Sequence, residues 1–283
     1  KAATREQYPV VHPENPEMQN SLAADISYLA NLAFQQGRVD EALKHYQSSL
    51  SILVKLNLAE PKQVRWKNYM ATLYMRIGDC QTALVSDIDA LSNFNAALVW
   101  QQQVSSELPG TEAQVDLCNN HIRIGDMQAR LGYADATLQS FQTAQSILQP
   151  VLAREPGSAS LQRSMSTILL RLGDALGDMK NFAAAESHMQ QAMQMRQKLA
   201  QATPQDGQLQ INVAIVHGSL GMVQEAQNHP EQAIAQFRLA QAISDQLVAK
   251  EPKNAQWQLA SAGFSGRIAS VDGSSLSLPA RKD

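Results

Sequence analysis

The sequence contains 283 residues, of which 44% are hydrophobic, and its formal net charge at pH 7 is −3. The apolar content is sufficient for a core, and the mixed charges form no basic face, which argues against a nucleic-acid partner. No run of 18 apolar residues occurs, so we expect no membrane span. Two cysteines, Cys80 and Cys118, match neither a disulfide framework nor a metal site. They favour the cytoplasm, although a periplasmic domain is also compatible with them.

Residues 1–13 are expected to be the end of an upstream segment or linker, because the chain begins at Lys1 and Pro13 already has the phase of later prolines. An upstream domain in the full-length chain is therefore expected. Residues 14–272 repeat with a period of 47 or 48 residues. The period is marked by one small residue in each unit: Ala30, Gly78, Gly125, Gly173 and Gly221.

Each unit predicts two helices joined by a turn. The first helix carries the marker residue, and the second presents a small, a large and a small side chain at 12, 16 and 19 residues beyond it, which is the spacing of one helix face. These columns are Ala42, Tyr46 and Ser49; Ala90, Phe94 and Ala97; Thr137, Phe141 and Ala144; Ala185, Met189 and Ala192; and Ala233, Phe237 and Ala240. The turns are predicted at Gly37, Ser86-Asp87, Gly132, Asn181 and Asn228-His229-Pro230.

Prolines in constant phase are expected to stop each second helix: Pro61, Pro109, Pro156, Pro204 and Pro252. Pro150 lies inside the third of these helices and predicts a kink or an early end. Asn254–Ser270 has the pattern of one more first helix, which would cap the array, and residues 273–283 are expected to be a flexible tail. The predicted fold is an all-α solenoid of five antiparallel hairpins plus a C-terminal capping helix.

The marker residues explain the packing that we expect. A glycine on the first helix and an alanine on the second allow the two helices of a hairpin to approach closely. The large residue of the second helix would fill the gap between successive hairpins. The repeat resembles the tetratricopeptide repeat, which has leucine and glycine on the first helix and alanine, an aromatic residue and alanine on the second. It resembles a long-period variety, because the family's usual period is about 34 residues. The resemblance covers about residues 14–271 and implies a superhelical α-solenoid that binds proteins.

No catalytic constellation is found, so we expect a protein that is not an enzyme and that uses no cofactor and no metal. None of the six histidines has metal-ligand spacing to a Glu or Cys. His121 and His217 share a column and are expected to be packed. Cys80 and Cys118 are expected to be core or half-buried thiols.

One charged motif recurs on three first helices. Arginine and aspartate are three residues apart in Arg76–Asp79, Arg123–Asp126 and Arg171–Asp174. One interpretation is salt bridging within and between repeats; the other is that these groups line a groove and bind a partner.

The resemblance implies a concave surface on the first helices. We predict that its partner-binding residues are Asn31, Thr72, Met75, Arg76, Asp79, Asn119, Ile122, Arg123, Asp126, Leu170, Arg171 and Asp174. The apolar line Met75–Ile122–Leu170 beside the carboxylates could accept a peptide with alternating apolar and basic side chains. Alternatively, a tightly curled solenoid would bury that line. Only Asn31 and Arg123 match the family's clamp for chaperone tails, so we expect no binding of such tails.

The sequence thus predicts a non-catalytic protein–protein interaction scaffold that binds a partner segment on the concave first-helix face. The alternative is a regulatory or sensor module of a larger bacterial signalling protein such as a kinase. Self-assembly through the terminal helices is a further alternative.

Overall fold

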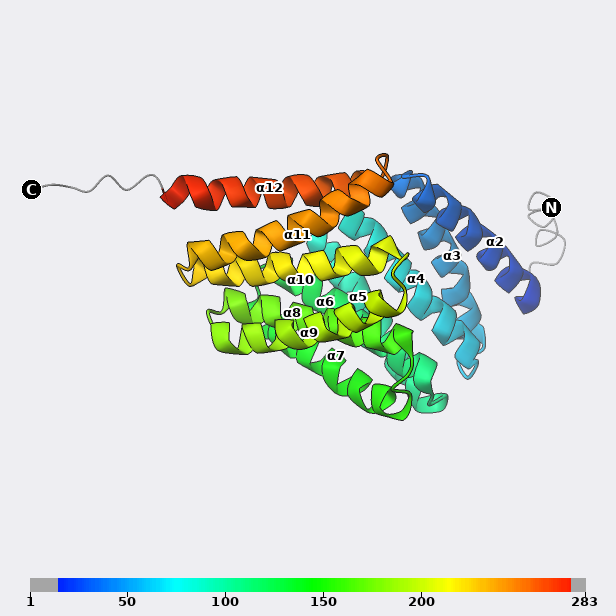
Figure 1. Ribbon diagram of the computed structural model, residues 1–283. Coiled ribbons are helices and arrows are strands. Elements are labelled where there is room, and N and C mark those ends of the chain that lie inside the picture. The colour runs from blue at the N-terminus through cyan, green and yellow to red at the C-terminus, as the bar shows by residue number, and fades with distance from the viewer. Residues whose placement is uncertain (1–14, 276–283) are drawn as a thin grey trace, which may run out of the picture. The chain divides into compact units, whose positions relative to one another are not determined.

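The computed structural model describes residues 15–275, and over that range the chain forms 11 α-helices and no β-strands. The helices pair into five antiparallel hairpins followed by a single last helix, which confirms the predicted fold class (Figure 1). The hairpins are α2 (Pro16–Gln35) with α3 (Val39–Ala59), α4 (Val64–Ala83) with α5 (Asp87–Glu107), α6 (Thr111–Arg130) with α7 (Ala134–Arg154), α8 (Ala159–Asp178) with α9 (Phe182–Ala202), and α10 (Gly207–Ala226) with α11 (Pro230–Lys250). The last helix is α12 (Ala255–Ser275).

The chain divides into two compact units after Val151, close to the end of α7. In unit 1, α3 packs on α4 and α5 packs on α6, so that the second helix of one hairpin contacts the first helix of the next. In unit 2, α10, α11 and α12 run alongside one another (Figure 1). None of the helices within residues 15–275 combines the length and the apolar content needed to cross a bilayer.

The two helices of a hairpin begin in different ways. Three of the first helices are capped by a side chain that accepts hydrogen bonds from free backbone N–H groups of the first turn, as N-caps do. Asn15 caps α2, Ser158 caps α8 and Asp206 caps α10. The second helices α3, α5, α9 and α11 have no side-chain cap, because each follows directly from the turn that ends the first helix.

That turn is a Schellman motif, repeated in all five hairpins. In the first, Arg38 N–H donates to the Ala33 carbonyl at 2.9 Å and Gly37 N–H donates to the Phe34 carbonyl at 3.0 Å. The motif places one residue in the left-handed region, where φ is positive. This residue is Gly37, Val85, Gly132, Lys180 and Asn228 in turn, with φ between 59° and 79°. The five turns lie where the sequence predicts them.

The glycines on the first helices provide space for a large residue of the second helix. A Cβ added to Gly78 would lie 2.5 Å from Phe94 Cε1, and one added to Gly125 would lie 2.5 Å from Phe141 Cε1. Gly173 with Met189 and Gly221 with Phe237 repeat this contact at 2.6 Å. The large residue therefore packs first on the glycine of its own hairpin, a contact that the sequence analysis did not anticipate. The expected packing between hairpins also occurs, because Phe94 belongs to one buried cluster with Ile124 and Met127 of α6.

The phased prolines behave as predicted, whereas one of the two effects predicted for Pro150, the early end, does not occur. Each second helix ends two residues before its phased proline, for example at Ala59 before Pro61. Pro150, however, lies inside α7 without ending it, and the helix continues to Arg154. With 21 residues, α7 is as long as the other second helices. The expected early end is therefore wrong: one missing N–H donor does not outweigh the packing of the buried residues Leu148 and Val151 on either side of Pro150. At the C-terminus, α12 extends to Ser275, beyond the predicted end at Ser270.

Candidate partner-binding cavities of unit 1

The predicted partner-binding residues lie on four first helices. Asn31 is on α2; Thr72, Met75, Arg76 and Asp79 are on α4; Asn119, Ile122, Arg123 and Asp126 are on α6; and Leu170, Arg171 and Asp174 are on α8. The first nine belong to unit 1 and the last three to unit 2. The two sets are therefore described separately.

Unit 1 contains a cavity of about 360 Å³ between α2 and α4, which we call the apolar cavity. Leu53 of α3 and Leu73 of α4 are deeply buried residues of its lining, and Tyr28 and Tyr69 are 63% and 45% exposed. Two predicted residues, Asn31 and Thr72, also line it. Asn31 is held in place because its Oδ1 accepts a hydrogen bond from the buried Tyr46 hydroxyl at 2.6 Å. The cavity combines apolar depth with two tyrosine rings, which suits an apolar or aromatic side chain.

A second cavity of unit 1, of about 190 Å³, lies between α4 and α6, and we call it the polar cavity. It brings together half of the twelve predicted residues: Thr72, Met75, Arg76, Asp79, Asn119 and Arg123. Asn68, Ala71, Gln101 and Asp116 complete its lining. Thr72 lines both cavities, so they are neighbours on α4. Ile122 and Asp126 line neither of the two.

The charges of the polar cavity are largely paired with one another. Asp79 Oδ1 accepts a hydrogen bond from Arg123 Nε of the next repeat at 2.9 Å, and its Oδ2 lies 3.7 Å from Arg76 Nη1 on the same helix. Salt bridges thus form both within and between repeats. Because two guanidinium groups already balance the Asp79 carboxylate, this carboxylate gives no reason to expect a basic side chain in the partner.

Gln101 is a cavity residue that the sequence analysis did not single out. It comes from α5, a second helix, and lies 23 residues beyond the marker Gly78. Its neighbour Trp100, 22 residues beyond the marker, is less deeply buried. Gln101 is only 9% exposed. The signal that could have identified it is a polar residue at a position that holds Leu53 and Leu148 in neighbouring repeats.

The predicted residues of unit 2 have a different environment. Leu170 is 4% exposed, whereas Met75 and Ile122 of the predicted apolar line are half-buried. Arg171 Nη1 lies 3.9 Å from Asp174 Oδ2. Burial raises the pKa of Asp174, against the opposing effect of a hydrogen bond with Ser219. Asp174 is one of the residues that line a cavity of about 240 Å³ between α8, α9 and α10.

Other groups singled out in the sequence are packed into the structure. Cys80 and Cys118 are both free and buried, and burial raises the pKa of the thiols to about 11 and about 12. His121 and His217 are half-buried, and His217 Nδ1 lies 2.7 Å from Gln236 Oε1. Among residues 15–275, no three His, Cys, Asp or Glu side chains are grouped as a metal site would require.

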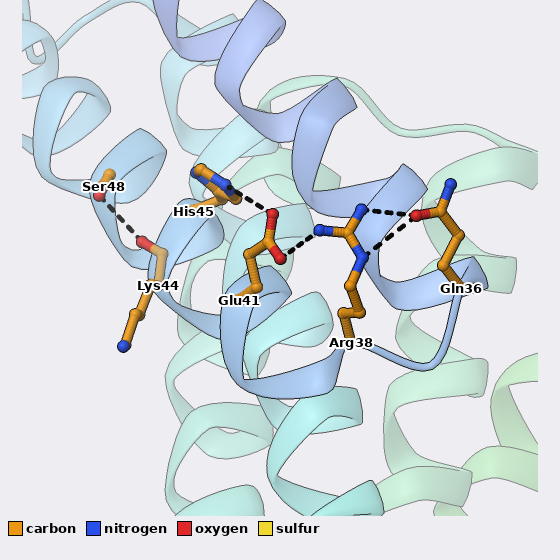
Figure 2. Close-up of polar contacts among 6 residues, drawn as sticks. All are labelled: Gln36, Arg38, Glu41, Lys44, His45 and Ser48. Carbon is orange, nitrogen blue, oxygen red and sulfur yellow. Dashed lines mark hydrogen bonds and ion pairs between the residues drawn. The ribbon is translucent and has the colours of Figure 1, made fainter.

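The turn between α2 and α3 carries a separate surface network (Figure 2). Arg38 donates from Nε and Nη2 to Gln36 Oε1 at 3.1 and 2.5 Å, and its Nη1 donates to Glu41. Glu41 Oε1 also lies 3.7 Å from His45 Nε2. Because every one of these partners lies within a single hairpin, the network stabilises the turn and does not form part of either cavity.

Comparisons with known proteins agree with this architecture. Tetratricopeptide repeat models match residues 26–57 and 164–246, and neither is the model of a catalytic family. No curated protein matches the sequence.

Solved structures resemble the fold at low identity. The apo form of RapI has a TM-score of 0.62 at 14% identity, over 90% of this chain and 82% of that one. BtubC from P. vanneervenii has a TM-score of 0.53 at 16% identity, over 87% and 95% of the two chains. A Podosopora anserina protein with nearly identical TPR-like repeats has a TM-score of 0.52 at 12% identity, over 84% and 99%. At these identities the likeness concerns the fold alone. The matching family models show that this chain contains tetratricopeptide repeats within residues 26–57 and 164–246, and its five repeated hairpins have the fold of tetratricopeptide repeat proteins.

Proposed function

We propose that this protein is a non-catalytic scaffold that binds a peptide segment of a partner protein along the first helices α2, α4 and α6 of unit 1. The observation that carries the proposal is the pair of adjacent cavities on these helices, which share Thr72. The larger cavity, at about 360 Å³, has the size of a pocket for a small ligand or for one large side chain. Side chains of an extended segment that point to the same side could occupy both cavities.

The two cavities supply the two elements that peptide recognition needs. The apolar cavity offers buried apolar surface and two partly exposed tyrosine rings, and such features are typical of the energetic centre of interfaces. The polar cavity offers hydrogen-bonding groups of both kinds, which fix the orientation and register of a bound chain. Because α4 contributes to both, a single segment lying across α4 would contact both.

The test uses a library of random peptides displayed on phage, selected on the purified protein. Selected peptides are then measured by fluorescence anisotropy with the wild type and with Thr72→Trp, which adds a bulky ring where the cavities meet. Thr143→Trp is the matched control: Thr143 lines neither cavity, and its hydroxyl bonds the carbonyl four residues earlier, as that of Thr72 does. We expect Thr72→Trp to weaken binding at least tenfold and Thr143→Trp to leave it within twofold. A failure to select any peptide, or equal affinities for the two variants, would contradict the proposed function.

A further inference from the structure

Gln101, which lines the polar cavity, and the buried Asn120 form a polar pair that replaces an apolar pair of the preceding repeat. Gln101 and Asn120 occupy the positions of Leu53 and Leu73, which pack together in the core of the first two hairpins. Asn120 is completely buried, and its Oδ1 accepts no hydrogen bond from the described residues. An amide oxygen left without a donor is unfavourable in a core. Packing therefore does not account for the presence of this pair.

The hydrogen bonds of the pair determine which way each amide faces. Asn120 Nδ2 donates to the Phe94 backbone carbonyl at 3.0 Å and to Gln101 Oε1 at 2.7 Å. Because a backbone carbonyl only accepts, Asn120 must present its NH₂ group on this side, and Gln101 must then present its oxygen to it. The NH₂ group of Gln101 is directed away from this contact, on a side chain that lines the polar cavity. No described residue accepts a hydrogen bond from it. The Phe94 carbonyl of α5 thus leaves a spare N–H donor on Gln101, a residue that lines the cavity.

The four charged side chains that line the polar cavity have no net formal charge. Arg76 and Arg123 contribute two formal positive charges, and Asp79 and Asp116 contribute two negative ones. A partner carboxylate would meet the two aspartates, and a partner ammonium would meet the two arginines. An uncharged group that both accepts and donates avoids either repulsion. A carboxamide is such a group: its oxygen can accept from Gln101, and its NH₂ can donate to a carboxylate or amide oxygen of the lining.

We propose that the polar cavity recognises an asparagine or glutamine side chain of the partner peptide, with the spare amide donor of Gln101 as the specificity-determining group. The inference rests on the proposed function, because it assigns chemistry to one of its two cavities. An apolar or aromatic side chain of the same peptide occupies the neighbouring apolar cavity.

The decisive variant is Gln101→Leu combined with Asn120→Leu. It reproduces the Leu53–Leu73 pair that already folds in this protein, so its melting temperature should equal or exceed that of the wild type. Peptides selected by the wild type are synthesised with their enriched Asn or Gln and with Leu or Glu in its place. For the wild type we expect the carboxamide peptide to bind at least fivefold more tightly than either replacement. For the double variant, the carboxamide and leucine peptides should bind within twofold of each other.

The outcomes separate this inference from the proposed function. Selected peptides that share an apolar residue and lose affinity with Thr72→Trp, but show no preference for Asn or Gln, would overturn the inference and leave the proposed function standing. A preference for Asp or Glu would also overturn the inference and leave the proposed function standing, because it would show that the cavity binds an acidic side chain. A carboxamide preference that persists in the double variant would overturn the role of Gln101. Failure to select any peptide would overturn both proposals.

Discussion

Val85 is a β-branched residue in a backbone conformation that favours glycine. Its φ is +59°, and it occupies the left-handed position of the α4–α5 turn, where the first and third hairpins have Gly37 and Gly132. Such a residue stores about 1–3 kcal/mol of strain. We therefore predict that Val85→Gly stabilises the protein.

The magnitude follows from three contributions. Removal of the strain contributes about 2 kcal/mol in the middle of its range. The greater freedom of glycine in the unfolded chain costs about 0.4–1 kcal/mol. The Val85 side chain is 74% exposed, so the lost burial costs only about 0.5 kcal/mol. The net gain in the free energy of unfolding is about 1 kcal/mol, which corresponds to an increase in melting temperature of about 2–4 °C.

Thermal melts followed by circular dichroism would measure this change, with two control variants. Gly132→Val introduces the strain in reverse, and a Cβ at Gly132 would meet no atom within 4 Å, so its loss of stability is conformational. Ile88→Gly removes a side chain that is 71% exposed, similar to Val85, but from within α5, and should lower the stability by about 0.5–1 kcal/mol. If Val85→Gly lowered the melting temperature as Ile88→Gly does, the argument from backbone strain would be wrong.

Three further predictions concern buried or half-buried side chains whose pKa is shifted by burial. Burial lowers the pKa of the Arg196 guanidinium to about 10, which indicates that desolvation of its charge is unfavourable. Arg196→Leu should therefore raise the free energy of unfolding, measured in urea titrations, by about 1–2 kcal/mol. A decrease would mean that the hydrogen bond from Arg196 to the Asn212 carbonyl outweighs the cost of desolvation. Cys80 and Cys118 should react with a thiol reagent at pH 8 at least a hundredfold more slowly in the folded than in the urea-unfolded protein, since burial raises the pKa of both thiols; similar rates would refute this. Burial lowers the pKa of His121 below the ordinary histidine value of about 6.5, so the folded protein loses stability relative to the unfolded chain as the pH falls from about 6.5 through the folded pKa. His121→Gln should therefore reduce the drop in the urea midpoint between pH 7 and pH 5. An unchanged drop would contradict this prediction.

The sequence was sufficient to predict the hairpins because their contacts are local and repeated. Gly78 and Phe94 are 16 residues apart in one hairpin, and the same pair of positions recurs in each unit, so the columns reveal the packing without coordinates. The phased prolines are equally informative, since each follows the end of its own helix. The strained turn position could not be found in this way. Val85 and Lys180 are not turn-forming residues, and the two backbone hydrogen bonds of the Schellman motif hold them at positive φ regardless of their identity.

The candidate site was only partly accessible from the sequence. Half of the predicted residues line the polar cavity because they share one face of α4 and α6. The tyrosines of the apolar cavity and Gln101 come from other positions, and their convergence depends on how α2, α4 and α5 pack together. The apolar pattern also concealed Gln101: the position 23 beyond the marker is buried in every repeat, yet Gln101, Arg196 and Ser244 interrupt its leucines. The interrupted leucine pattern therefore hides a position that is buried in all five repeats.

Arg196 shows that polarity at this core position does not by itself indicate a binding site. Its Nη1 donates to the Asn212 carbonyl at 2.7 Å, and its Nε lies 3.4 Å from Ser166 Oγ, so its hydrogen bonds are directed to neighbouring helices of its own unit. Gln101 uses its oxygen in the same internal way but keeps an N–H donor for a cavity. The two residues therefore differ in whether an N–H donor is left without an acceptor among the described residues. It follows that Arg196→Leu should change the stability of the protein and leave peptide affinity unchanged, whereas the leucine pair at positions 101 and 120 should change peptide preference without loss of stability.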